Sequence, residues 1–203
     1  MSSNPEILVD RLNQLIDDLL SHQIPAPAFE KQYMELWREA RDSGAFRGLI
    51  ADDANYFDRI FTAVDMYCAD VSLRSTNELG DEELEREVAR QEGLRRLVGG
   101  QLTSVQFVLD YLILGFDERG ALTTLVWPKL EEQGHQTHFG MSGYRDKLCS
   151  LIKRTVRSAS CDGSETICIQ FKEGEELRIP LRSYEKTGER AILTGPQHFL
   201  LVF

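Results

Sequence analysis

The side chains best suited to metal chemistry fall between residues 131 and 138. Glu131 and Glu132 are followed by His135 and His138, and carboxylates and imidazoles are ligands that a zinc ion accepts. Gly134 interrupts the spacing that a helix would need to point all four side chains inward. We therefore interpret this segment as a solvated loop, and we predict no metal and no other cofactor.

Cys149 is the thiol whose neighbours in sequence could activate it. Arg145 and Lys147 lie close by, and cationic neighbours lower the pKa of a thiol. No histidine is in register to act as a base. We therefore interpret Cys149 as a small buried core residue and not as a nucleophile.

The four cysteines are expected to be reduced. Cys161 and Cys168 flank the turn Asp162-Gly163; with these two residues as the hairpin loop, Cys161 pairs with Ser164, which argues against a disulfide. We expect no targeting segment, since no charged and then apolar stretch opens the sequence, and no apolar run approaches the roughly 20 residues of a membrane span. We predict a cytoplasmic protein without membrane contact.

The common catalytic motifs are missing from the sequence. There is no GxGxxG, P-loop, HExxH or GxSxG pattern. Carboxylates are plentiful, but in a chain with 33 acidic residues the presence of paired acids carries no information. We therefore predict that the protein is not an enzyme.

The net charge of −10 is concentrated in the first half of the chain. Residues 1–97 contain 20 acidic and 11 basic residues, which gives −9, whereas residues 98–203 contain 13 and 12, which gives −1. A negative field repels nucleic acid and anionic membranes and attracts basic proteins. The expected partner is a basic protein, without direct nucleic-acid binding.

Residues 1–97 follow the hydrophobic period of helices. We expect a first helix that is capped at Ser3-Asn4 and ends before Pro25, and a second from near Pro27 to Gly44. A third begins at about Asp53 and carries Tyr67 and Cys68 inward, and a fourth begins after Gly80-Asp81. Four amphipathic helices with short connections predict an antiparallel four-helix bundle.

After Gly99-Gly100 the pattern changes to that of strands. Residues 102–109, 111–116, 121–127, 153–160, 165–171, 175–180 and 199–203 are predicted strands, and Ser142 caps one short helix. The fold class expected is α+β with two domains. Residues 1–97 would form the acidic four-helix bundle, and residues 98–203 a β-rich domain with one helix on an antiparallel sheet.

The stretch FTAVDMYCAD, residues 61–70, combines a core face with two carboxylates. Phe61, Val64 and Tyr67 share one helical face, and Asp65 lies at its rim. We predict that the acids here face a partner protein, together with a nearby acidic group. The candidate contacts are Asp65, Tyr67, Asp70, Glu78, Asp81, Glu82 and Glu83.

Structural roles for these residues remain open alternatives. Asp65 would then pair with Arg38 or Arg41, and Asp70 would be an ordinary turn residue. The acids from Glu78 to Glu83 would be a solvated helix start that complements the helix dipole. Tyr67 would be a core residue.

The first half resembles the immunity proteins of the colicin D type, a family of small helical bacterial self-protection proteins. The resemblance covers roughly residues 5–95. It implies a bundle that binds a tRNA-cleaving toxin domain and covers its basic active site, with acids in place of RNA phosphates. It places contact acids on Asp65 and Asp70, whereas a further acidic position falls on Cys68. The motifs are Leu15-Ile16-Asp17-Asp18-Leu19-Leu20, Phe29-Glu30-x-x-Tyr33-x-x-Leu36-Trp37, Phe61-x-x-x-Asp65-x-x-x-x-Asp70 and Asp81-Glu82-Glu83-Leu84-x-x-Glu87-Val88.

The second half more faintly resembles an uncharacterised bacterial domain of predicted immunity proteins in polymorphic toxin systems. That resemblance implies toxin neutralisation and names no residues. Its motifs are Val98-Gly99-Gly100-x-Leu102-Thr103-x-Val105, Phe116-Asp117 and Ser183-Tyr184-Glu185 followed by Ile192.

Two other functions compete with toxin neutralisation. A small-molecule sensor or hydrolase would hold a perturbed acid or thiol in a pocket between the two domains. A dimerising scaffold would bury the acidic face in a homo-oligomer, a state that the sequence leaves open.

Overall fold

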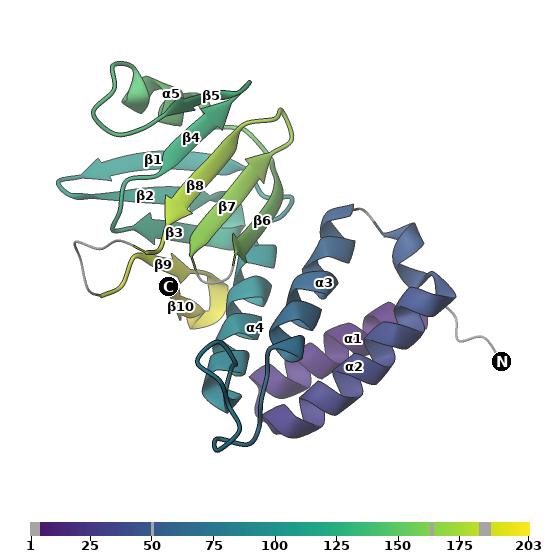
Figure 1. Ribbon diagram of the computed structural model, residues 1–203. Coiled ribbons are helices and arrows are strands. Elements are labelled where there is room, and N and C mark those ends of the chain that lie inside the picture. Colours follow the sequence, from purple (N-terminus) through teal and green to yellow (C-terminus); the bar gives the residue numbers. More distant parts are fainter. Residues whose placement is uncertain (1–4, 50, 163–164, 183–187) are drawn as a thin grey trace. The chain divides into compact units, whose positions relative to one another are not determined.

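The computed structural model describes residues 5–49, 51–162, 165–182 and 188–203 (Figure 1). It consists of two compact units, Met1–Gln91 and Glu92–Phe203, and each unit has its own hydrophobic core. The predicted α+β class is confirmed: four helices are followed by a β-rich region with one helix. The division into domains 1–97 and 98–203 stays a prediction.

The first unit contains three whole helices and, as far as Gln91, most of a fourth, and these helices are in contact. They are α1 (Pro5–Leu20), α2 (Ala26–Ser43), α3 (Ala51–Asp65) and α4 (Asp81–Arg95), with a short 3-10 turn, η1 (Ala45–Gly48), after α2. Gly44 ends α2 in the left-handed conformation, φ 76°, and its N–H bonds to the carbonyls of Ala40 and Arg41. The cap predicted at Ser3-Asn4 lies outside the described residues.

The apolar faces of α1, α2 and α3 meet the first part of α4 in one core, whereas Leu94, near the end of α4, belongs to the core of the second unit. Leu12 of α1, Phe29 of α2, Phe57 of α3 and Leu84 of α4 are all fully buried. The hydroxyl of Tyr33 donates to the backbone oxygen of Phe57 over 3.0 Å, which ties α2 to α3. The helical half of the fold therefore follows directly from the hydrophobic period of the sequence.

The third helix ends earlier than the sequence predicts. It stops at Asp65, so the prediction that Tyr67 and Cys68 belong to its inward face is wrong. The chain turns there and forms a parallel bridge between Tyr67 and Leu79. Cys68 N–H donates to the Leu79 oxygen, and Leu79 N–H donates to the Met66 oxygen. These hydrogen bonds take the place of helical ones, so Tyr67 is buried as part of the bridge with Leu79 and not as part of a helix.

The second unit contains two five-stranded antiparallel sheets. The first has the order β1-β2-β3-β9-β10 and the second β5-β4-β8-β7-β6, so the predicted strands divide between two sheets (Figure 1). The strands are β1 (Leu102–Val108), β2 (Tyr111–Phe116), β3 (Gly120–Thr124), β4 (Lys129–Glu132), β5 (His135–Thr137), β6 (Val156–Asp162), β7 (Thr166–Phe171), β8 (Glu176–Pro180), β9 (Ala191–Thr194) and β10 (Leu200–Val202).

The two sheets contribute alternate side chains to one core. Leu112 and Leu114 of β2 and Ile167 and Ile169 of β7 are buried, while the residues between them are partly exposed. The helix α5 (Tyr144–Ser150) buries Tyr144, whose hydroxyl donates to the Pro128 oxygen over 2.7 Å.

The prediction of a loop for the segment with Glu131, Glu132, His135 and His138 is wrong, because most of this segment forms a β-hairpin. Strands β4 and β5 pair Glu132 with His135, and Gln133 and Gly134 form the turn with positive φ. Within the described ranges, no group of three or more His, Cys, Asp or Glu side chains could hold a metal ion.

The structure contradicts the predicted burial of Cys149 and the predicted strand partner of Cys161. Cys149 is exposed and not part of the core, because α5 buries Tyr144 and Leu148 instead. Cys161 pairs with Ile167, because β6 continues to Asp162 and β7 begins at Thr166, and the predicted partner Ser164 lies outside the described residues. All four cysteines are free thiols.

Candidate functional site

The predicted contact residues lie on or beside the segment that joins α3 to α4. We call residues 66–80 the α3–α4 connection. The parallel bridge between Tyr67 and Leu79 joins its two ends, so the start and the end of this fifteen-residue segment lie close together. The interior of the connection is organised by a series of short hydrogen bonds.

Asp70 builds the first turn of the connection. Its Oδ1 accepts hydrogen bonds from the backbone N–H of Ser72, over 2.8 Å, and from the Ser72 hydroxyl, over 2.6 Å. Its backbone oxygen accepts from the N–H groups of Leu73 and Arg74. These two Ser72 bonds hold the pKa of the Asp70 carboxyl below its usual value, because they favour the charged form.

Glu78 closes a second turn in the same way. Its Oε2 accepts from Ser75 N–H over 2.6 Å, and its own N–H donates to the Ser75 oxygen. The hydrogen bonds from Ser75 lower the pKa of the Glu78 carboxyl. Both turns are therefore formed with the carboxylates ionised at neutral pH.

Arg74 lies inside the connection and ties it together. Its Nε donates to the Cys68 oxygen over 3.0 Å. Its guanidinium also lies against Gly80, where an added Cβ would be 2.2 Å from Nη1 and 2.7 Å from Glu83 Oε2. The absence of a side chain at Gly80 leaves the space that Arg74 and Glu83 occupy.

The start of α4 is a capping arrangement. Glu83 Oε2 accepts from Gly80 N–H over 3.0 Å, and Leu84 N–H donates to the Gly80 oxygen. Asp81, Glu82 and Glu83 occupy the first turn, where the helix dipole favours negative charge. The structural role proposed for Glu83 is thus present, and it leaves the side chain exposed.

Tyr67 links the connection to α4. Its side chain is only 7% exposed, and its hydroxyl donates to Asp81 Oδ1 over 2.8 Å. Burial raises the pKa of the Tyr67 hydroxyl well above its usual value, and the hydrogen bond to Asp81 and the charge of Asp81 raise it further. Tyr67 therefore packs inward and positions Asp81.

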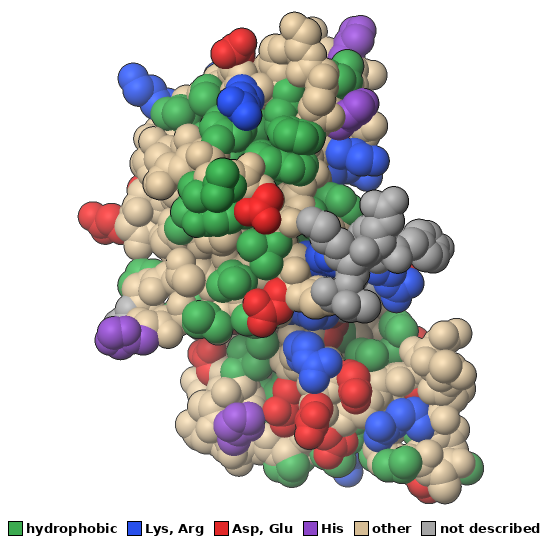
Figure 2. Space-filling view, turned by 90° about the vertical axis from the view of Figure 1, so that its left-hand side faces the viewer, with side chains coloured by type: hydrophobic (Ala, Val, Ile, Leu, Met, Phe, Trp, Pro, Cys, Tyr) green, Lys and Arg blue, Asp and Glu red, His purple; other side chains and the backbone are tan. Residues whose placement is uncertain are grey.

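The six predicted contact acids are all exposed, and we call them the acidic surface: Asp65, Asp70, Glu78, Asp81, Glu82 and Glu83. Between residues 65 and 83 the sole basic residue is Arg74. Figure 2 shows acidic side chains gathered in the lower part of the view, over the helical unit. The structure connects Tyr67 with Asp81 directly but forms no bond between Asp65 and Asp70 among the described residues.

The ion pair considered for Asp65 is not formed among the described residues. Arg41 pairs with Asp42 over 2.8 Å and lies over the Trp37 ring instead. Asp65 stays exposed at the end of α3. Its carboxylate is thus available to a partner.

Three exposed apolar residues on the same segment escaped sequence reasoning. Val71 is 77% exposed, Leu73 75% and Met66 41%. Val71 and Leu73 lie outside any helical or strand period, so hydrophobic patterning had no means of placing them, whereas Met66 falls within the span expected for the third helix, outside its predicted inward face. The available signal for Val71 and Leu73 was their position between the turn-forming residues Asp70 and Ser75.

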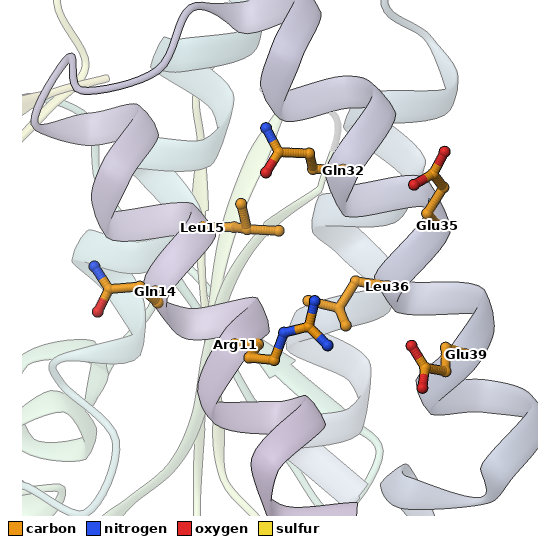
Figure 3. Close-up of a pocket in the computed structure, with 7 residues that line it drawn as sticks. All are labelled: Arg11, Gln14, Leu15, Gln32, Glu35, Leu36 and Glu39. Atoms are coloured by element: carbon orange, nitrogen blue, oxygen red, sulfur yellow. The ribbon is translucent and has the colours of Figure 1, made fainter. Parts of the chain in front are cut away.

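Hollows are also found elsewhere on the described surface. One, of about 310 Å³, is an open groove between α1 and α2 lined by Arg11, Gln14, Leu15, Gln32, Glu35, Leu36 and Glu39. In Figure 3 the Arg11 guanidinium lies beside Leu36, and the Glu39 carboxylate points toward the same space. The second, of about 400 Å³, is lined by residues 139–141 and 143–146 of the β-rich unit. Neither groove contains a nucleophile paired with a base.

Comparisons with known proteins agree with this description of the helical unit. Residues 8–97 match the model of a family described as bacterial self-protective colicin-like immunity. The match confirms the resemblance of this region to that family and implies binding and neutralisation of a cognate colicin-like toxin, while the C-terminal half stays unassigned. No curated protein and no solved structure matches the chain. Among the described residues, no helix has both the length and the apolar character needed to cross a membrane.

Proposed function

We propose that the helical unit binds the catalytic domain of a basic nuclease toxin and blocks its active site with the acidic surface. The family match over residues 8–97 supports toxin neutralisation in general. The observation that carries the finer proposal is the exposure of six carboxylates, with one basic residue, on residues 65–83. The protein would act in the cytoplasm by binding alone, without catalysis of its own.

Charge complementarity would make association with the toxin fast. A nuclease must carry lysine and arginine side chains where it binds the phosphates of its substrate. Exposed carboxylates on the immunity protein can pair with those cations. The attraction between opposite charges raises the association rate by about a hundred-fold or more at low salt. Inhibition then follows because the same cations are no longer free for RNA.

Preorganisation of the α3–α4 connection would increase the affinity for the toxin. The turns at Asp70 and Glu78 and the clasp of Arg74 on Cys68 hold the α3–α4 connection in one conformation before binding. Ordering a flexible loop on binding costs about 0.5–1.5 kcal/mol for each immobilised side chain. A connection that is already ordered avoids most of that cost.

The test uses the full chain as bait in lysate of its own producing cells at low salt. We expect it to retain a basic protein with a nuclease-like domain and to release that protein as salt is raised. The variant Asp65→Asn/Asp70→Asn should release it at lower salt, because an asparagine in place of Asp70 keeps an oxygen for the Ser72 bonds while the charge is lost. Asp110→Asn, an exposed acid of the other unit, is the matched control. Failure to retain any basic protein would contradict the proposal.

A further inference from the structure

The exposed apolar side chains of the helical unit are concentrated on the α3–α4 connection. Among its described residues, four large hydrophobic side chains are exposed, and three of them, Met66, Val71 and Leu73, belong to this connection. The fourth is Ile7 near the start of α1. Scattered exposed apolar residues need no explanation, but a cluster of this kind within fifteen residues does.

Val71 and Leu73 are held in place on the surface. They flank Ser72, whose N–H and hydroxyl are both bonded to Asp70. Leu73 N–H also donates to the Asp70 oxygen, and the neighbouring Arg74 is bonded to the Cys68 oxygen. The two side chains are therefore presented by an ordered turn, although 77% and 75% of their surfaces remain in water.

We propose that Val71 and Leu73 are apolar anchors that insert into a depression on the basic toxin, between the lysine and arginine side chains that the acidic surface engages. This inference rests on the function proposed above and names the chemistry of the contact. Carboxylates provide attraction that salt screens, whereas the burial of apolar side chains is insensitive to screening. The anchors would account for the part of the affinity that persists at high salt.

Charge determines which occupant fits this surface. A second copy of the chain would place six carboxylates opposite six others, with one arginine on each side to offset them. Like charges at close range cost several kcal/mol in an interface. A basic protein matches the surface, so the anchors belong to a contact with the toxin and not to a homodimer.

The test compares dissociation constants for the basic protein that the bait captures, expressed separately, at about 50 mM and about 500 mM salt, where screening differs strongly. We expect Val71→Ser/Leu73→Ser to weaken binding by about tenfold or more at both salt concentrations, leaving the salt dependence unchanged. Asp65→Asn/Asp70→Asn should weaken binding chiefly at low salt. Leu109→Ser, at a residue 98% exposed in the other unit, is the matched control and should bind as the wild type does.

The outcomes separate the two proposals. If the captured protein binds Val71→Ser/Leu73→Ser as tightly as the wild type, the anchors are refuted while toxin binding stands. If no basic protein is captured at all, both proposals fall. Circular dichroism on each variant checks that the fold is intact, and replacement of side chains this exposed should leave the spectrum unchanged. Sedimentation that shows a dimer lost in Val71→Ser/Leu73→Ser would assign the surface to a second copy and overturn the inference.

Discussion

Replacing Tyr67 with Phe removes one hydrogen bond between the start of the α3–α4 connection and α4. The hydroxyl donates to Asp81 Oδ1 over 2.8 Å, and the ring is buried and stays in place. Hydrogen bonds to charged groups contribute about 1.5–3 kcal/mol, but the exposed Asp81 carboxylate regains water when the partner is lost. We therefore expect the free energy of unfolding at pH 7 to fall by about 1 kcal/mol.

The pH dependence gives the same prediction a second, independent test. The pKa of the Tyr67 hydroxyl is raised in the folded protein, first by burial and then by Asp81. Below about pH 10 both states keep the proton, and above it the unfolded chain ionises first, so wild-type stability falls as pH rises. At about pH 10.5 that loss is about 0.8 kcal/mol, and Tyr67→Phe lacks it. The gap between the two proteins should shrink from about 1 to about 0.2 kcal/mol.

Urea unfolding followed by the helical circular dichroism signal measures both quantities. The variants are Tyr67→Phe, Asp81→Ala and the double variant, at about pH 7 and about pH 10.5, on either side of the ordinary tyrosine pKa. In the Asp81→Ala background, Tyr67→Phe should cost almost nothing further, since the acceptor is already missing. A gap that widens at the higher pH, or an equal cost in both backgrounds, would refute the assignment of this hydrogen bond.

Three further predictions concern single positions. Gly120→Ala should lower the free energy of unfolding in urea by about 3 kcal/mol or more, because φ is 121° and the new Cβ would lie 1.9 Å from the Thr194 oxygen. Gly174→Ala, at a residue with positive φ but open space around it, should lower it by about 1 kcal/mol in the same assay. Glu83→Ala should lower stability by about 0.5–1 kcal/mol and Glu83→Gln by less, since glutamine keeps an acceptor for Gly80 N–H. The Asp70 carboxyl should titrate below its usual pKa in NMR, and Ser72→Ala should raise that pKa; the turn is stabilised above about pH 3.9 and weakens as pH falls through the lowered value.

The helical unit was predictable because helix period and core burial agree there. Residues such as Leu12, Phe29 and Phe57 lie at the expected spacing and are buried. The end of α3 was not predictable from the same period, since Tyr67 continues the apolar spacing but belongs to a bridge with Leu79. That pairing depends on a residue twelve positions away, which local periodicity does not register.

In the β-rich unit, the sequence predicted the strands with an apolar face but not the short polar strands. The apolar alternation of β2 and β7 identified both strands, because one face of each is buried. Strands β4 and β5 are short and polar. They form because β4 pairs with β8, with Leu130 opposite Leu177, and because β5 pairs with β4. Such strands follow from their neighbours in space and not from their own residues.

The candidate surface was predicted in part. The six acids were selected from their number and from the family resemblance, and each of them is exposed. The sequence suggested a turn role for Asp70 only as an alternative to partner contact and suggested none for Glu78, yet both carboxylates form turns through Ser72 and Ser75 and remain exposed. Hydrophobic patterning also did not single out Val71 and Leu73, whose signal was their position between the turn-forming residues Asp70 and Ser75.

Inhibition of the captured toxin is the most direct test of the proposed function. RNA cleavage by that protein should be measured while the full chain is added in increasing amounts, at concentrations above the dissociation constant. We predict that cleavage falls linearly and stops at one chain per toxin, and that Asp65→Asn/Asp70→Asn requires an excess. Cleavage that continues unchanged in the presence of a saturated complex would show that the acidic surface does not cover the active site.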